Sequence, residues 1–319
     1  MPKRFKKENF KGDNKKQEPG KGSGKNISRQ KEEGYPRKYQ VKDQSMRKDR
    51  HKKGQEAGAA AIPNYEKALQ ASPKGNLKKE SGPDDLIRLN RYIANAGICS
   101  RREADNLIAQ GDITVNDKVI NSLGHKVKKT DTVKYKGKVL KREKMIYVLL
   151  NKPKGYITTT QDPNDRKTVM HLVANACEER IYPVGRLDRN TTGLLLLTND
   201  GDLTKKLSHP SHKVKKLYQV DLDKPVSDED FLKIQAGITL EDGVAEVDEL
   251  AFVTPDNKSL GIEIHIGRNR IVRRIFESLG YEVVKLDRVM YAGLTKLDLP
   301  RGRWRYLTEQ EVVKLKYLK

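Results

Sequence analysis

The stretch "VGRLDRNTTGLLLLTNDG", residues 184–201, places one carboxylate, Asp188, between two arginines and shortly before a run of leucines. The apolar run 193–197 is short, is bounded by turn residues and is far below membrane-spanning length. It therefore predicts a buried core segment. Asp188 then lies where a loop enters the core, which suits a positioned reactive group and also a structural ion pair with Arg186 or Arg189.

Length and charge limit the classes of protein that the chain can belong to. Its 319 residues allow two or three domains, and 65 Lys and Arg against 43 Asp and Glu give a net charge of +22. Polyanions are therefore the expected partners, nucleic acid first and an acidic membrane surface second. The sequence has no signal-peptide apolar region and no membrane-length stretch, so we expect a cytoplasmic protein without a membrane partner. Cys99 and Cys177 lie far apart, which predicts free thiols and no zinc site.

More than half of the excess positive charge lies in the first 80 residues. Residues 1–83 are rich in Lys, Gln, Gly and Asn and have almost no aliphatic periodicity, so we expect a disordered basic tail. Within it, the run 56–71 could form a transient helix. The tail can bind RNA phosphates loosely or merely keep the protein soluble, and we favour the RNA contact.

Residues 84–143 have the pattern of a small folded module. Leu89, Ile93 and Ala96 follow helical spacing, and Ser100 with Glu103 forms a capping box that opens a second helix. The segments 112–120 and 131–140 alternate like short strands joined by tight turns. Five basic residues lie off the apolar stripes and form either an ordinary solvated face or a phosphate-binding ridge: Arg88, Arg91, Arg101, Arg102 and Lys118.

This module resembles an S4 domain, a small RNA-binding fold. The resemblance rests on Ser-Arg-Arg-Glu-Ala at residues 100–104 and Gly-x-Ile-x-Val-Asn at residues 111–116. It implies that the basic face and Ser100 bind RNA.

The rest of the chain, residues 144–319, mixes strands such as 147–152, 216–222 and 261–267 with helices such as 268–280. Because the strands and helices do not alternate regularly, the pattern predicts an α+β fold.

Three stretches in this part, 147–169, 180–220 and 264–289, resemble the bacterial ribosomal pseudouridine synthases of the RsuA and RluB type, most of all the RluB type. In that family an S4 domain precedes a catalytic domain with a mixed, largely antiparallel sheet. The resemblance implies isomerisation of uridine to pseudouridine without a cofactor, on ribosomal RNA or a ribosomal subunit precursor, and most of all on large-subunit RNA. Small-subunit ribosomal RNA or tRNA stays open as the substrate. A non-catalytic RNA-binding assembly factor is the alternative from another class.

The resemblance also implies roles for individual residues. Asp188 is the catalytic carboxylate, Arg273 pairs with it, and Tyr218 stacks on the uracil and helps to remove the C5 proton. Without the resemblance, Tyr218 would be interpreted as a core residue of an alternating strand. Arg186 takes the place of the uridine that leaves the RNA stack.

The reaction breaks the C1'–N1 bond, turns the uracil and joins C5 to C1', so it needs neither a redox step nor a metal. It needs a carboxylate that stays ionised in a dry pocket, either to attack the sugar or to remove its C2' proton. A nearby guanidinium would keep the pKa of that carboxylate low against desolvation.

Further polar residues have weaker signals. Arg268, Arg270 and Arg274 are expected to contact the RNA backbone, with a solvated helix face as the alternative. Lys152 and Pro153 match a family motif that implies structural support beside the pocket. His209 and His212 have a spacing seen in metal sites, but no cluster completes a coordination set, so we expect a surface turn and no metal. Residues 240–250 are acidic and predict an exposed hairpin. We expect a monomer.

Overall fold

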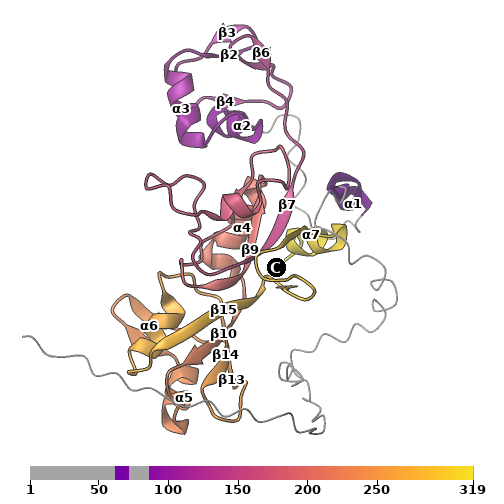
Figure 1. Cartoon of the computed structure of the whole chain (residues 1–319). Coiled ribbons are helices and arrows are strands. Elements are labelled where there is room, and N and C mark those ends of the chain that lie inside the picture. Colours follow the sequence, from indigo (N-terminus) through magenta and orange to yellow (C-terminus); the bar gives the residue numbers. More distant parts are fainter. Residues whose placement is uncertain (1–61, 72–85, 319) are drawn as a thin grey trace, which may run out of the picture. The chain divides into compact units, whose positions relative to one another are not determined.

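The computed structural model describes residues 62–71 and 86–318 (Figure 1). Most of the expected basic tail, residues 1–83, therefore lies outside the described residues, and its disorder stays a prediction. The domain limits placed at residues 83 and 143 also stay predictions.

One segment of the expected tail forms a packed helix instead of the transient helix that we predicted. Helix α1 (Tyr65–Ala71) lies beside helix α7 (Glu309–Lys316) (Figure 1). Tyr65 is 3% exposed, its hydroxyl donates a 2.9 Å hydrogen bond to the Leu307 carbonyl, and its ring meets Tyr147 edge-on at 4.8 Å between centroids. A helix of this length is marginal alone, so tertiary packing of one aromatic side chain is what stabilises it.

Residues 87–139 form two helices and two small antiparallel sheets around one core. Ser100 and Glu103 make both hydrogen bonds of the predicted capping box, at 3.2 and 2.7 Å, and start the second helix. The predicted hairpins are also present. The elements are β1 (Ile87–Arg88), α2 (Leu89–Asn95), α3 (Arg101–Ala109), β2 (Ile113–Val115), β3 (Lys118–Val119), β4 (Lys126–Val127), β5 (Val133–Tyr135) and β6 (Lys138–Val139), with sheet orders β1-β4 and β3-β2-β5-β6.

Strands β7 to β10 and β13 to β17 form one nine-stranded sheet. Seven of them follow the path β13-β14-β10-β15-β9-β7-β17, while β16 pairs with β15 and β8 pairs with β9. Strands β15 and β9 pair in parallel, and the other neighbours are antiparallel, so the prediction of a mixed, largely antiparallel α+β fold is confirmed. The strands are β7 (Tyr147–Lys152), β8 (Tyr182–Pro183), β9 (Thr192–Thr198), β10 (Lys216–Leu222), β13 (Glu249–Phe252), β14 (Ser259–Ile264), β15 (Val283–Tyr291), β16 (Leu294–Thr295) and β17 (Trp304–Tyr306).

The leucine run of the opening stretch is the buried strand β9. Leu195 and Leu197 pack into one hydrophobic cluster, whereas Leu194 and Leu196 pack into a second. Because successive side chains of a strand point to opposite faces, β9 is covered on both sides. A strand buried on both faces has a continuous apolar run rather than an alternating one.

Short helices and one separate hairpin complete this part. The predicted helix over 268–280 is shorter than expected, because Arg270 has a left-handed backbone with φ of 46° and the helix begins only at Ile271. Among the described residues, no helix has both the length and the apolar character needed to cross a membrane. The elements are η2 (Val169–Leu172), α4 (Gly201–Ser208), η3 (Pro210–His212), α5 (Asp228–Ala236), the hairpin β11 (Ile238–Leu240) with β12 (Gly243–Ala245), and α6 (Ile271–Glu277).

Candidate active site

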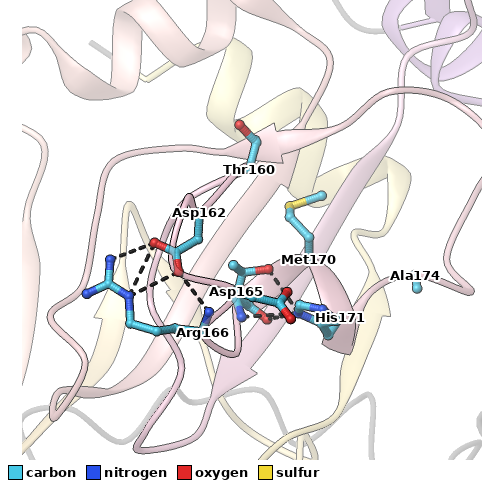
Figure 2. A pocket seen from close by; sticks show the side chains of 8 residues that line it. Thr160, Asp162, Asp165, Arg166, Met170, His171 and Ala174 are labelled. Carbon is cyan, nitrogen blue, oxygen red and sulfur yellow. Dashed lines mark hydrogen bonds and ion pairs between the residues drawn. The ribbon is translucent and has the colours of Figure 1, made fainter.

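A cavity of about 300 Å³ lies in the loop after β7 (Figure 2). Its polar groups bind one another: the Arg166 guanidinium donates to both oxygens of Asp162, and His171 Nδ1 lies 3.1 Å from the Thr168 backbone nitrogen. None of the residues that we predicted to be catalytic lines this cavity. This cavity is therefore not the candidate active site, which lies around Asp188. The cavity is lined by Thr160, Asp162, Asp165, Arg166, Thr168, Met170, His171 and Ala174.

Asp188 lies half-buried in the loop between β8 and β9. The residue before it, Leu187, is 6% exposed and belongs to the larger hydrophobic cluster. The Thr158 hydroxyl donates to the Leu187 carbonyl at 2.8 Å and accepts from the Leu187 N–H at 3.3 Å. Behind Asp188, the Thr191 N–H donates to the Asp188 carbonyl at 3.1 Å and closes a turn. The backbone of Asp188 is therefore fixed from both sides.

Lys152 binds the carbonyl groups of the same loop. Its side chain is fully buried, and its ammonium donates to the carbonyls of Asp188 at 3.0 Å and Thr191 at 2.7 Å, with a longer contact of 3.4 Å to Arg189. The Gly155 N–H adds a 2.8 Å bond to the Arg189 carbonyl. The segment 152–158 after β7 thus determines the course of the loop, which agrees with the structural role expected for Lys152.

Two buried cations lie near the Asp188 carboxylate. Burial lowers the pKa of Lys152 to about 8, and the charge of Asp188 acts against that shift. Burial and the neighbouring Arg270 lower the pKa of Arg273, while Asp188 again acts in the opposite direction. Within residues 86–318, however, no ion pair joins Asp188 to Arg186, Arg189 or Arg273. The pairing of Arg273 with Asp188 stays a prediction.

Arg273 lies on α6 with 8% exposure, and its guanidinium donates to the Val283 carbonyl at 2.8 Å. Its Nε is buried and lacks a hydrogen-bond partner among the described residues. A buried donor without a partner is expensive, so such an atom often marks a site that a ligand completes.

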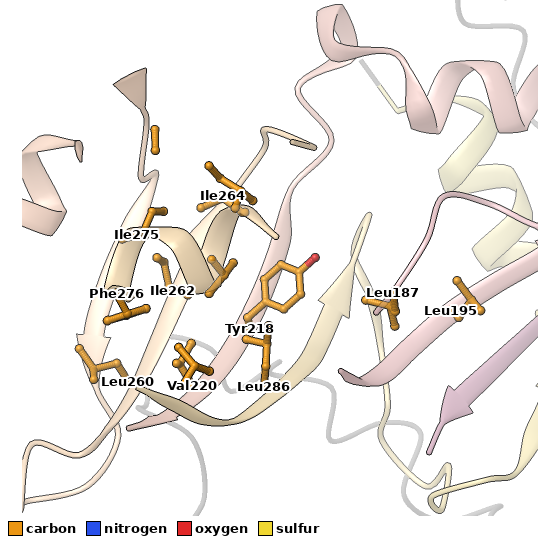
Figure 3. Close-up of a cluster of buried hydrophobic side chains, with 14 of the residues drawn as sticks. Leu187, Leu195, Tyr218, Val220, Leu260, Ile262, Ile264, Ile275, Phe276 and Leu286 are labelled. Carbon is orange, nitrogen blue, oxygen red and sulfur yellow. The ribbon is translucent and has the colours of Figure 1, made fainter. Parts of the chain in front are cut away.

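Tyr218 lies on β10 with 8% exposure and belongs to the same hydrophobic cluster as Leu187. Figure 3 shows its ring among the apolar side chains, with the hydroxyl at the end remote from Leu286. This position is compatible with both interpretations of Tyr218, as a core residue of the strand and as the surface on which the uracil stacks. The ring is a core residue, and its cluster extends to the residue next to Asp188.

Sequence reasoning missed a third buried cation, Arg288 on β15. It is 3% exposed and stands opposite both Tyr218 on β10 and Gly193 on β9. Its Nε donates to the Leu194 carbonyl at 2.7 Å, and its guanidinium lies 4.6 Å from the ring centre of Tyr291. No sequence signal distinguishes it, because Lys285 and Asp287 in the same strand are charged too.

Unpartnered polar atoms gather near this site. The described residues contain four buried side-chain polar atoms without a hydrogen-bond partner, and three of them are Thr191 Oγ1, Arg273 Nε and Arg288 Nη2. Thr191 was not predicted, although it follows Asp188 by three residues. The residues around Asp188 are therefore polar and incompletely paired, as expected of a site that receives a polar substrate.

The three other arginines near α6 are not free cations. Arg274 binds both oxygens of Asp242 at 2.7 and 2.9 Å, Arg268 contacts the same carboxylate at 3.4 Å, and Arg270 pairs with Glu277 at 3.0 Å. Arg268 and Arg270 precede the helix, so the alternative of a solvated helix face does not describe them. Their contact with RNA stays a prediction.

The remaining predicted RNA-binding residues lie at or near the surface. The hydroxyl of Ser100 caps α3, Arg91 is half-buried on α2, and Arg186 is exposed two residues before Asp188. The exposed S4-like residues are Arg88, Arg101, Arg102 and Lys118. Across the described part of the chain, no three His, Cys, Asp or Glu side chains gather as a metal-binding group, and Cys99 and Cys177 are free.

Comparisons with known proteins agree with this architecture. Residues 87–133 match the S4 domain family, and residues 146–278 match the family described as RNA pseudouridylate synthase. Ribosomal large subunit pseudouridine synthase B of Bacillus subtilis is 43% identical over 237 residues, which cover 73% of this chain and 97% of that protein. Dual-specificity RNA pseudouridine synthase RluF of Escherichia coli K12 is 37% identical over 236 residues, 73% of this chain and 79% of that protein. A solved crystal structure of a pseudouridylate synthase has 29% identity and a TM-score of 0.52 over 72% of this chain and 99% of its own.

Proposed function

Because this chain belongs to the RNA pseudouridine synthases, we propose that it isomerises a specific uridine of ribosomal RNA and that Asp188 is the catalytic carboxylate. The observation that carries the role of Asp188 is the loop geometry. Lys152 and Thr158 bind the backbone on both sides of this residue, so its carboxylate is positioned before the substrate arrives. A solvated surface aspartate would not need this support.

The charge around Asp188 suits the reaction. Lys152 and Arg273 both interact electrostatically with the Asp188 carboxylate, so two positive charges lie near the group that acts on the sugar. An ionised carboxylate is required whether it attacks C1' or removes the C2' proton. In either route the glycosidic C1'–N1 bond breaks, C1' joins C5, and the proton lost from C5 is balanced by the proton gained at N1.

The unpartnered donors have a role in this proposal. Arg273 Nε, Arg288 Nη2 and Thr191 Oγ1 are buried polar groups for which the uridine, or a rearrangement on its binding, would supply acceptors. Tyr218 would provide the flat surface for the base that leaves the RNA stack. The same proposal includes RNA binding by residues of the S4-like module and of the loop before Asp188. These residues are Arg88, Arg91, Ser100, Arg101, Arg102, Lys118 and Arg186.

Large-subunit ribosomal RNA is the substrate that we propose, because the Bacillus subtilis relative is named for the large subunit. The dual specificity in the name of the Escherichia coli relative makes a second RNA the natural alternative. We also propose that the enzyme acts as a monomer in the cytoplasm, where ribosomal RNA is found.

The experiment is pseudouridine mapping of total ribosomal RNA and tRNA by carbodiimide treatment and primer extension. Cells that lack the gene are complemented with the wild type or with Asp188→Asn. We expect one site to disappear in the deletion strain and to return only with the wild type, while purified Asp188→Asn binds RNA with near-normal affinity. A variant that restores the modification would remove Asp188 from its role, and an unchanged map would refute the proposed reaction.

A further inference from the structure

The tip of the β11–β12 hairpin contacts the segment that leads into α6. Asp242 lies in the hairpin turn, and Arg274 donates to both of its oxygens, at 2.9 Å from Nη1 to Oδ2 and 2.7 Å from Nη2 to Oδ1. Arg268 donates to Asp242 Oδ1 at 3.4 Å and to the Gly243 carbonyl at 2.8 Å. Two guanidinium groups therefore converge on one carboxylate.

This arrangement has the chemistry of a phosphate site. Arginine binds a carboxylate and a phosphate with the same two-pronged geometry, because both present a pair of oxygens in one plane. Hydrogen bonding from Arg274 lowers the pKa of Asp242 to about 2, so the carboxylate is charged at every pH of interest. Glu241, the neighbour of Asp242 in the hairpin turn, also interacts electrostatically with Arg274, so a phosphate would bind by replacing the Asp242 carboxylate rather than by adding to a surplus of positive charge.

The three side chains are accessible. The exposed fraction of the side chain is 32% for Arg268, 25% for Arg274 and 45% for Asp242. Exposed ion pairs exchange partners at small cost, because water and salt already screen them. An RNA phosphate can therefore replace Asp242 without breaking the core.

The arginines are held more firmly than the carboxylate. The Lys216 ammonium donates to the carbonyls of His265 at 2.6 Å and Ile266 at 3.4 Å, which fixes the chain just before Arg268. Arg274 lies within α6, next to Arg273. Asp242 instead lies in the turn of a hairpin that makes no ladder bonds with the nine-stranded sheet, although Ile238 and Ala245 at the base of this hairpin are buried in the larger hydrophobic cluster. If an RNA phosphate replaced Asp242, the hairpin tip would move and both arginines would stay in place.

We propose that Arg268 and Arg274 form a binding site for a phosphodiester group of the substrate RNA, and that Asp242 occupies this site in the free protein. The proposal rests on the proposed function for its choice of RNA. Arg274 follows Arg273 on α6, so the phosphate would be bound by the helix that also carries the predicted partner of Asp188. RNA then has to compete with Asp242 for the two arginines.

The test measures the affinity of the full-length protein for a fluorescein-labelled oligouridylate at several KCl concentrations. Asp242→Asn removes the competing charge, and Glu229→Gln is the matched control, because it removes one exposed negative charge that pairs with Lys233 on α5. We expect Asp242→Asn to bind about three- to fivefold more tightly at 0.15 M KCl, with a steeper dependence of affinity on salt. Glu229→Gln should change the affinity by less than about twofold.

A second variant shows whether the gain comes from the arginines. Adding Arg274→Gln to Asp242→Asn should abolish the gain. The proposal is overturned if Asp242→Asn binds no more tightly than Glu229→Gln, or if the gain survives the loss of Arg274. Pseudouridine formation is scored separately, so a tighter Asp242→Asn complex in a protein that forms no pseudouridine would refute the proposed function and leave the phosphate site standing.

Discussion

At the scale of single residues, the position of the carboxylate is determined by side chains distant in sequence. Thr158 and Lys152 lie 29 or more residues before the loop that they bind. Neither contacts the Asp188 carboxylate through a hydrogen bond; both act on the backbone around it. Their loss should therefore reduce the rate of the chemical step more than the affinity for RNA.

The run Thr158-Thr159-Thr160 offers a matched test of that statement. Thr158→Val keeps the shape of the side chain but removes both hydrogen bonds to Leu187, so kcat should fall about tenfold with little change in the dissociation constant of RNA. Thr158→Ser should retain most of the activity. Thr159→Val loses only two local bonds, one to the Gln161 carbonyl and one from the Gln161 N–H, and should behave like the wild type. Equal rates for the two valine variants would show that Thr158 does not position the loop.

Lys152 predicts a pH dependence. With a pKa of about 8, its ammonium is present at pH 7 and is lost as the pH rises through 8. The neutral amine has one donor fewer for the loop carbonyls and no charge beside Asp188, so single-turnover rates should fall by up to about tenfold per pH unit above 8.

The same proton affects stability with the opposite sign: the rate should fall with pH, whereas the free energy of unfolding should rise. The folded protein releases this proton near pH 8, whereas the unfolded chain keeps it until about pH 10.4. Between these values the group makes the free energy of unfolding rise with pH. The decline in rate should therefore occur without unfolding, which circular dichroism at each pH can check. A rate that stays constant to pH 9.5 would show that the charge of Lys152 is not needed.

At the scale of elements, the parallel contact between β9 and β15 brings distant parts of the site together. Gly193 has φ of 107°, and a Cβ on it would lie 2.2 Å from the Arg288 carbonyl oxygen. Only glycine permits this approach. Asp287 reinforces it from the next position, because it accepts from the Thr192 hydroxyl at 2.9 Å and pairs with Arg301 at 2.9 Å.

This contact also separates what the sequence could predict from what it could not. The buried leucine run and the capping box at Ser100 depend on local patterns, which one sequence displays, whereas the catalytic role of Asp188 rests on the family resemblance and stays a prediction. Arg288 and Asp242 acquire their importance from hydrogen-bond partners that lie 94 and 32 residues away. A single sequence holds no signal for which strands lie side by side, so the acidic segment 240–250 was predicted only as an exposed hairpin and Arg288 was not singled out.

At the scale of the whole molecule, the N-terminal region has two parts with different physical roles. Residues 1–61 carry about half of the net charge of +22, which can act on RNA only through salt-dependent attraction. Tyr65 is instead part of the hydrophobic cluster formed by β7, β9 and α7, with Leu307, Val312 and Leu315 among its members. Deletions that end on either side of α1 should therefore have different effects.

Removal of residues 1–61 should weaken RNA binding and flatten its salt dependence without changing the melting temperature or stopping turnover, because α1 is kept.

Removal of residues 1–80 also deletes Tyr65 and should lower the free energy of unfolding by about 3 kcal/mol, close to the effect of Tyr65→Ala in the full chain. Tyr65→Phe keeps the ring and loses only the bond to Leu307, so it should lower that free energy by about 1 kcal/mol. Urea unfolding and RNA titrations at several KCl concentrations measure both quantities. If the two deletions have the same stability, α1 does not stabilise the fold; if the shorter deletion leaves the salt dependence unchanged, residues 1–61 do not contact the RNA.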